Sequence, residues 1–366
     1  MSHSIYWHCY RKIPGIGQTR LRSLMRGFSS GEEAWNASAS ALRSIGVSEE
    51  IAAEIVRART DIDPELEAKA LGEMDIRIMT ETEEYFPTLL RETPFPIAMI
   101  YVRGNFDNWT RPMISIVGTR KHSAYGRQAA ERIAADLSRA GVTVVSGLAY
   151  GIDSVAHGAT VREDGATIAV LGGGSDDASI HPKEHLPLAT RIMESGALLT
   201  EYPPGTAPAR GTFPARNRVI AALSSGVIVV EAAEKSGSLI TADLALECGR
   251  EVFAVPGSIF SPVSEGTNHL IQKGAKLIRG VGDILEELIL ESTDTSVSTD
   301  PKSIPTPANL SPEEAKIFSI LSHEATHVDE IIKRSHLDTS AASSALTMLE
   351  VKGLARNIGG MNYIRS

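Results

Sequence analysis

The spacing of hydrophobic residues divides the 366-residue chain into segments of different kinds. Up to about residue 65, apolar residues recur at helical spacing, first around Leu21 and again around Ile55. Two glycine turns, Pro14–Gly17 and Ile45–Val47, interrupt this segment, and an expected helix follows each turn. We therefore predict a small helical domain over residues 1–68.

Between about residues 75 and 290, short β-branched runs alternate with amphipathic stretches. The expected strands are Met113–Val117, Val142–Val145, Thr167–Leu171, Ala197–Leu199, Val227–Val230 and Val252–Val255. The expected helices between them are Arg127–Ala140, Ser154–Glu163, Lys183–Glu194, Ala215–Leu223 and Ser238–Cys248. Strands that are apolar along their whole length are typical of a parallel sheet covered on both faces. The pattern predicts an α/β domain over residues 75–290, built on a mainly parallel sheet with helices on both faces.

The last part of the chain begins with a polar, proline-rich stretch, which we interpret as a linker over residues 291–309. Three short amphipathic helices are expected after it, followed by a hairpin bounded by glycines. Their ranges are 311–322, 327–334 and 339–352 for the helices and 356–365 for the hairpin. Three helices followed by a small β-wing predict a winged-helix domain over residues 310–366.

Composition narrows the class of protein. The chain carries 36 Lys and Arg against 45 Asp and Glu, a net charge of −9, which disfavours coating of duplex DNA by bulk charge. Its two cysteines, Cys9 and Cys248, lie far apart, which excludes a disulfide scaffold and cysteine-ligated metal centres. No signal-peptide core and no apolar run near the ~18 residues of a membrane span is present. We expect a cytoplasmic protein that does not bind membranes.

The usual cofactor motifs are missing. The dipeptide Gly-Lys never occurs, which disfavours a P-loop, and the best dinucleotide candidate, Gly172–Asp177, lacks its third glycine. His181–His185 matches an inverted zincin string, but such short strings arise by chance, and we interpret it as a helix start with surface histidines. The possible general acids and bases are Asp153, His157, Glu201 and Glu231. Because no nucleophile–base spacing accompanies them, we predict no catalytic residue. Because the motifs above are missing or arise by chance, we predict no metal and no cofactor.

Small-residue turns follow the first two expected strands of the α/β domain. Gly118–Gly126 follows one strand and Ser146–Asp153 follows the next. The carboxyl ends of parallel strands share one edge of the sheet, where bare backbone amides and helix N-termini suit a phosphate, and Arg120 adds a charged donor. The expected phosphate-binding residues here are Gly118, Thr119, Arg120, Ser146 and Gly147.

Two further clusters open expected helices and are candidates for the same site. The candidate residues in them are Arg216, Asn217, Arg218, Lys235, Ser236, Gly237 and Ser238. Plainer interpretations remain open, because two arginines can form a salt-bridged helix face and serines commonly cap helices.

The local distribution of charge along the chain favours binding of a polyanion. Windows 1–31, 110–130 and 202–218 hold five, four and three bases with no acid, and the last two coincide with the expected phosphate-binding edge. Three aromatic residues lie near this edge and could stack nucleobases: Tyr125, Tyr150 and Phe213. A basic groove with aromatic faces is typical of single-stranded DNA binding.

Several of these motifs, taken together and in this order, resemble the DNA-processing protein A family, also called DprA or Smf. The matching runs are Ile116–Arg120, Ser146–Asp153, Val170–Gly174, Phe213–Arg218, Ser236–Ala242, Val255–Gly257 and Gly266–Ile271. The resemblance covers residues 80–285 strongly, and both flanks fit the family's architecture of a helical N-terminal domain and a winged-helix tail.

The resemblance implies an extended Rossmann-like sheet domain in a homodimer. It implies sequence-independent binding of single-stranded DNA and loading of the RecA recombinase on incoming DNA during natural transformation and recombination in competent cells, with no cofactor and no catalysis. Carried over by position, Arg120 is the phosphate-contacting arginine, while Lys235–Gly237 and Arg216–Arg218 belong to the basic groove. The turn Gly15–Gly17 resembles half of a helix–hairpin–helix, which grips a backbone phosphate. His181 departs from the family, which commonly has an aromatic residue before this proline.

Two alternatives stay open. A nucleotide phosphoribohydrolase-like enzyme has a related Rossmann-like fold, but residues 231–238 lack its Pro-Gly-Gly-x-Gly-Thr-x-x-Glu string. A duplex-binding regulator would use the tail, but residues 311–366 hold seven acids and six bases, which does not favour strong DNA binding. We favour a partner or dimer role for the tail.

Overall fold

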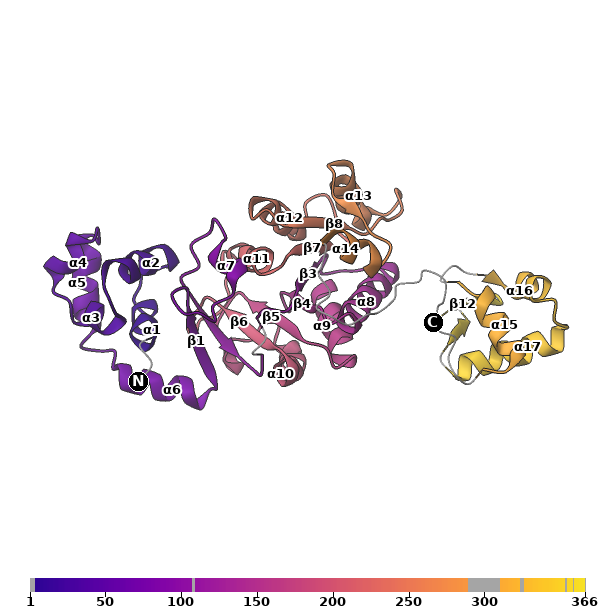
Figure 1. Ribbon diagram of the computed structural model, residues 1–366, viewed down its shortest axis with the longest axis horizontal. Coiled ribbons are helices and arrows are strands. Elements are labelled where there is room, and N and C mark those ends of the chain that lie inside the picture. The colour runs from indigo at the N-terminus through magenta and orange to yellow at the C-terminus, as the bar shows by residue number, and fades with distance from the viewer. Residues whose placement is uncertain are drawn as a thin grey trace. The chain divides into compact units, whose positions relative to one another are not determined.

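The computed structural model describes residues 4–106, 109–288, 310–322, 326–352, 354–357 and 359–365 (Figure 1). The chain divides into two compact units, residues 1–291 and 292–366. The predicted linker, residues 291–309, lies entirely outside the described residues, and the domain boundaries proposed above stay predictions.

A nine-stranded sheet forms the centre of the first unit. Its strands are β1 (Ile76–Thr80), β2 (Met99–Arg103), β3 (Met113–Val117), β4 (Thr143–Ser146), β5 (Thr167–Leu171), β6 (Ala197–Thr200), β7 (Gly226–Val229), β8 (Glu251–Ala254) and β9 (Lys276–Leu277), in the order β1-β2-β6-β5-β4-β3-β7-β8-β9. The pairings from β6 through β9 are parallel, whereas β2 pairs antiparallel with β6 and with β1. All six expected strands are present within one residue of their predicted bounds, and the mainly parallel sheet is confirmed; β1, β2 and β9 were not predicted.

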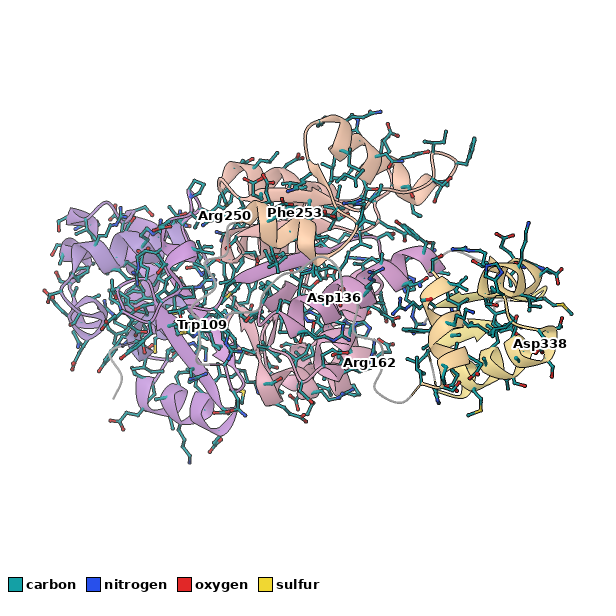
Figure 2. All side chains as sticks on the ribbon, turned by 45° about the vertical axis from the view of Figure 1, so that its right-hand side comes forward. Trp109, Asp136, Arg162, Arg250, Phe253 and Asp338 are labelled. Carbon is teal, nitrogen blue, oxygen red and sulfur yellow. The ribbon has the colours of Figure 1, made fainter. Side chains whose placement is uncertain are left out.

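Helices cover both faces of this sheet. One face carries α7 (Thr88–Arg91), α11 (Thr212–Leu223), α12 (Gly237–Glu247) and α13 (Glu265–Gln272), and the other carries α8 (Ala124–Arg139), α9 (Ile152–Arg162), α10 (Leu186–Ser195) and α14 (Val281–Leu288). Alternation along β7 explains this arrangement: Val227 and Val229 belong to the first core, Ile228 and Val230 to the second. Phe253 of β8, labelled in Figure 2, is also fully buried in the second core. The strands are apolar on both sides because both sides are buried.

Three short 3₁₀ turns complete the sheet region. They are η1 (Asp177–Ser179), η2 (Lys183–His185) and η3 (Pro262–Ser264). The helix expected over Lys183–Glu194 is therefore divided into η2 and α10.

Six helices precede the sheet and pack around a core of their own. They are α1 (Ile5–Arg11), α2 (Gln18–Gly27), α3 (Gly31–Asn36), α4 (Ala39–Ser44), α5 (Glu49–Ala58) and α6 (Pro64–Glu73). Gly15 and Gly46 adopt φ of +83° and +90°, which L-residues with side chains rarely adopt, so both turns need glycine. Ser48 caps α5 by accepting a hydrogen bond from the Ile51 amide. Tyr101 of β2 is part of the same core, so these helices pack against the β1–β2 end of the sheet.

The second unit has the predicted winged-helix architecture. Its helices are α15 (Pro312–Ile320), α16 (Val328–Ser335) and α17 (Thr339–Val351), and its strands are β10 (Thr326–His327), β11 (Ala355–Asn357) and β12 (Asn362–Arg365), in the order β10-β12-β11. Ser311 and Glu314 form a capping box that starts α15. Ile317, Ile331 and Leu349 are fully buried in a core that belongs to this unit alone. The short strand β10 was not predicted.

Candidate nucleic-acid interface

A pocket lies where the strand order of the sheet reverses. From β3, the chain adds β4, β5 and β6 on one side and then returns to place β7 and β8 on the other. In open α/β sheets, ligands bind beyond the carboxyl ends of the strands at such a point. A cavity of about 490 Å³ opens there. Its wall comes from the turns after β3 and β4 and from the first turns of α11 and α12.

Backbone hydrogen bonds join the turn after β3 to the segment after β7 and to the turn after β4. The Thr119 amide donates to the Glu231 carbonyl oxygen (2.8 Å), and the Ile152 amide donates to the Thr119 carbonyl oxygen (3.2 Å). Gly151 has φ of +86°, and a Cβ atom there would lie 2.2 Å from the Thr119 carbonyl oxygen. The close approach of the two turns therefore requires glycine, and it fixes the backbone that carries Arg120.

Glu231, which follows β7, holds the segment between Arg120 and α8. Its buried carboxylate accepts hydrogen bonds from the Ser123 amide (2.9 Å) and the Ser123 hydroxyl (2.5 Å). A Cβ atom on Gly126 would lie 2.1 Å from Glu231 Oε2, so this glycine leaves room for the carboxylate. Glu231 thus serves the structure of the rim.

Arg216 forms part of the pocket floor. Its side chain is 5% exposed, and its Nη1 atom donates to the carbonyl oxygens of Gly147 and Val170 (2.5 Å each). A Cβ atom on Gly147 would lie 2.2 Å from that nitrogen. Burial raises the pKa of the nearby Asp153 carboxyl, although the positive charge of Arg216 opposes the rise. Arg216 therefore joins the floor to the ends of β4 and β5 and balances a buried acid.

Arg218 points away from the pocket. Its Nη2 atom lies 2.6 Å from Glu201 Oε1, and its Nη1 atom donates to the Pro96 carbonyl oxygen (3.3 Å). Burial raises the pKa of the Glu201 carboxyl, whereas Arg218 and Arg11 lower it. Here the plainer interpretation, a salt bridge, describes the contacts of Arg218.

The first turn of α12 forms the opposite wall. Ser236 accepts a hydrogen bond from the Ser238 amide (3.4 Å) and so caps the helix, while Lys235 lies exposed just before it. Asn217 Nδ2 reaches from α11 to the Gly237 carbonyl oxygen (3.4 Å). The N-terminal amides of α12 thus face the same cavity as the start of α11.

Seven of the twelve predicted site residues line this cavity, and five do not. Those that line it are Gly118, Arg120, Arg216, Asn217, Ser236, Gly237 and Ser238. Those that lie outside its lining are Thr119, Ser146, Gly147, Arg218 and Lys235. Ser146 is fully buried, and its hydroxyl donates to the Ile116 carbonyl oxygen (2.6 Å). The contribution of each residue to binding stays a prediction.

Among the other lining residues, Arg210 was not a predicted site residue, and Phe213 was expected only as a stacking ring. Arg210 and Phe213 both line the cavity, and the Arg120 guanidinium carbon lies 5.5 Å from the centre of the Phe213 ring. Within the described residues, neither Arg120 nor Arg210 has an ion-pair partner. The acid-free window 202–218 was the signal that could have identified Arg210. Two exposed guanidinium groups, helix amides and a ring can together hold an anionic, aromatic ligand.

The remaining acid–base candidate is deeply buried. Desolvation lowers the pKa of His157 to about 3, with smaller contributions from the charges of His185 and Arg216. The described residues contain no group of three or more His, Cys, Asp or Glu placed to hold a metal ion. In the same part of the chain, no helix is long and apolar enough to cross a membrane.

Comparison with known proteins adds independent evidence. Residues 77–289 match the family model of the DNA recombination-mediator protein A, and residues 301–361 match that of the DprA winged helix domain. Protein Smf of Synechocystis sp. is 34% identical over 100% of this chain and 99% of its own length. The DNA processing protein DprA of Bacillus subtilis is 45% identical over 60% of this chain and 73% of its own length.

Solved structures agree with the sequence matches. DNA processing protein A from Streptococcus pneumoniae superposes with a TM-score of 0.68 at 34% identity, covering 77% of this chain and 97% of that one. The Helicobacter pylori protein, described for its single-stranded DNA binding mode, superposes with a TM-score of 0.53 at 29% identity, covering 59% and 96%.

Proposed function

Because the chain belongs to the DNA recombination-mediator protein A family, we propose that it binds single-stranded DNA and passes it to the RecA recombinase during natural transformation. The observation that carries this proposal is the pocket at the switch in strand order. There, the guanidinium groups of Arg120 and Arg210, which have no ion-pair partner among the described residues, share one cavity with the N-terminal amides of α12 and the Phe213 ring.

Such a pocket recognises the backbone and the aromatic character of a strand rather than its sequence. Guanidinium groups and helix amides bind phosphate oxygens, which every nucleotide carries, and a phenyl ring stacks on any base. Single strands are favoured because their bases are free to leave the stack and reach the ring.

Salt dependence tests this proposal. We expect the full chain to bind single-stranded oligonucleotides of mixed sequence with similar affinity and duplexes of equal length more weakly. The logarithm of the binding constant should fall with the logarithm of salt concentration by roughly 0.7 for each phosphate neutralised. Equal affinity for duplex and single strand at every salt concentration would contradict the proposal.

The structure gives no specific observation in favour of the phosphoribohydrolase alternative. Glu231, the acid nearest its expected motif position, is committed to holding Ser123. Assay of base release from nucleoside monophosphates tests the point directly, and turnover that disappears in Arg120→Ala would favour the enzyme.

We also propose that the protein acts as a homodimer in the cytoplasm. In support, strand β9 lies at the edge of the sheet and its Leu277 side chain is 42% exposed, so contact with a second copy would bury this side chain. Light scattering after size-exclusion chromatography measures the mass of the particle and so tests the homodimer.

Transfer of DNA to RecA is tested separately. Single strands that already carry this protein should stimulate the formation of RecA filaments.

A further inference from the structure

A second cavity lies beside the edge strand β1, away from the pocket described above. It holds about 550 Å³, and its wall comes from α1, from the end of α2 with the turn into α3, and from the turn after β1. Strands β2, β6, β5 and β4 separate β1 from β3 in the sheet, and the two cavities share no lining residue. A ligand in this second cavity would therefore not occupy the candidate DNA-binding pocket.

Apolar groups form one part of this wall. Trp7 and Met25 are buried, Phe28 is half-buried, and all three line the cavity. The Trp7 ring stacks on the Tyr10 ring with 5.8 Å between the ring centres, which holds it in place before a ligand arrives. The faces of aromatic rings carry partial negative charge and attract cations. Two rings and a thioether thus favour a cation that has a flat, weakly hydrated surface.

A single acid completes the wall. Among the described residues that line the cavity, Glu83 alone is charged, and it has no ion-pair partner in the described part of the chain. Its half-buried carboxylate accepts a hydrogen bond from the Thr80 amide (3.3 Å). Burial raises the pKa of this carboxyl, although the hydrogen bonds from Thr80 oppose the rise. A cation beside Glu83 would offset the cost of its burial.

Two arginines of the same region have other partners. Arg22 Nη2 lies 2.6 Å from Glu81 Oε2. Arg91 Nη2 donates to the backbone carbonyl oxygen of Glu83 (2.7 Å), and its Nε atom donates to that of Glu81 (3.2 Å). Both side chains therefore hold the turn after β1, and neither is paired with the Glu83 carboxylate.

Acids outnumber bases around the cavity. The turn over residues 80–84 holds three acids and no base. Glu32 and Glu33 lie in the first turn of α3 and offset the positive end of its dipole. Arg26 of α2 is exposed and lies outside the lining. This distribution of charge favours a basic partner and disfavours an anion such as DNA.

Arginine is the cationic side chain that fits this wall best. Its flat guanidinium group stacks on aromatic faces and donates two parallel hydrogen bonds to one carboxylate, whereas the ammonium group of lysine is compact and strongly hydrated. Free arginine fits less well, because its own carboxylate would find no positive side chain in the described lining.

We propose that this cavity binds an arginine side chain of a partner protein. The guanidinium group lies on the rings of Trp7 and Phe28 and pairs with Glu83. Because the cavity is separate from the candidate DNA-binding pocket, the partner docks on a chain whether or not that chain carries a single strand.

Blocked tripeptides test the proposal on the full chain. Acetyl-Gly-Arg-Gly-amide should bind, and its citrulline counterpart, which has nearly the same shape but no charge, should bind about tenfold more weakly. The lysine counterpart should also bind more weakly than the arginine peptide, because an ammonium group cannot form the paired hydrogen bonds. Isothermal titration calorimetry measures the affinities. In NMR spectra, the arginine peptide should shift the indole N–H resonance of Trp7 and leave that of Trp109, which lies outside the lining, in place.

Three variants locate the binding. Glu83→Gln should weaken binding of the arginine peptide about tenfold. Glu84→Gln is the matched control, since Glu84 is exposed and lies outside the lining, and it should leave the affinity unchanged. Phe28→Leu keeps apolar bulk but removes a ring, so it should weaken binding about threefold. All three variants should give the far-ultraviolet circular dichroism spectrum of the unmodified protein, which shows that they fold.

Four results would each overturn the proposal. They are equal binding of the arginine and citrulline peptides, equal binding of the arginine and lysine peptides, equal effects of Glu83→Gln and Glu84→Gln, and no binding of the arginine peptide to the unmodified protein. None of these results depends on whether the protein binds DNA.

Discussion

At the scale of single residues, the two arginines at the start of α11 differ by their place on the helix. Arg216 and Arg218 are two positions apart, and side chains at that spacing point to different sides of a helix. Arg216 is turned into the pocket floor, and Arg218 is turned to Glu201. Helical geometry alone could have predicted that both would not face one cavity.

Arg120 and Arg218 therefore give a matched pair of substitutions. Arg120→Ala should weaken binding of every single-stranded oligonucleotide about equally and reduce the salt slope by about 0.7, because one phosphate contact is lost. Arg218→Ala should leave the salt slope unchanged. It should lower the free energy of unfolding by about 3 kcal/mol, because Glu201 stays buried without its partner. Fluorescence anisotropy and urea denaturation measure the two effects. A loss confined to some sequences in Arg120→Ala would contradict phosphate binding.

His157 should make stability depend on pH. Its Nδ1 atom lies 2.8 Å from the Thr167 hydroxyl, whose proton goes to the Val144 carbonyl oxygen. Its buried Nε2 atom has no hydrogen-bond partner among the residues that the structure describes. Burial lowers the pKa of His157 to about 3, below the value near 6.5 of the unfolded chain. Between these values only the unfolded chain takes up the proton, so stability is lost as pH falls below about 6.5.

The measurement is a comparison with His157→Gln. From pH 7 to pH 5, the free energy of unfolding of the wild type should fall relative to the variant by up to about 1.4 kcal/mol per pH unit. The comparison removes the opposite effect of Asp153 and Glu201, whose raised pKa values favour the folded state as pH falls. Parallel stability curves would show that His157 carries no such charge penalty.

At the scale of elements, the sequence predicted those whose pattern is local. Strands such as Thr167–Leu171 and the serine cap of α12 follow from a few adjacent residues. β2 was missed because the apolar run Ile97–Val102 follows a proline-containing loop, and one of its two antiparallel partners, β6, lies almost a hundred residues away. β9 was missed because two residues carry no periodicity.

In the site, too, local patterns could be predicted from the sequence, whereas contacts between distant residues could not. The glycine turns and Arg120 were predictable because parallel strands bring their carboxyl ends to one edge. The role of Glu231 was not, since the contact with Ser123 joins residues 108 positions apart through the pairing of β3 with β7. Binding roles of individual residues stay predictions until they are measured.

That contact gives a prediction for α8. Glu231→Gln replaces an acceptor oxygen by an amide NH2 group, which can only donate, so one of the two Ser123 donors loses its acceptor. The free energy of unfolding should fall by about 1–3 kcal/mol, and amide exchange should quicken in the first turn of α8. Glu234→Gln, an exposed neighbour in the same segment, is the control. Unchanged exchange in the first turn of α8 would show that Ser123 is held by other contacts.

At the scale of the whole molecule, the two units have separate cores, and the pocket belongs entirely to the first. The third helix of the tail, α17, contains no lysine or arginine between Thr339 and Val351. In helix-turn-helix proteins a helix of this kind enters the major groove, where basic side chains usually contact the phosphates. The tail is therefore poorly suited to duplex binding, and its role towards a partner or in a dimer stays a prediction.

Removal of the tail tests whether DNA binding belongs to the first unit alone. A chain ending at residue 291 should fold, because its three large clusters of buried residues lie within it, and should bind single-stranded oligonucleotides with unchanged affinity and salt slope. The isolated tail should bind neither single strands nor duplexes at physiological salt, given its nearly balanced charge. If all DNA affinity is instead lost with residues 292–366, the tail is the DNA-binding part. The pocket at the sheet edge would then need another ligand.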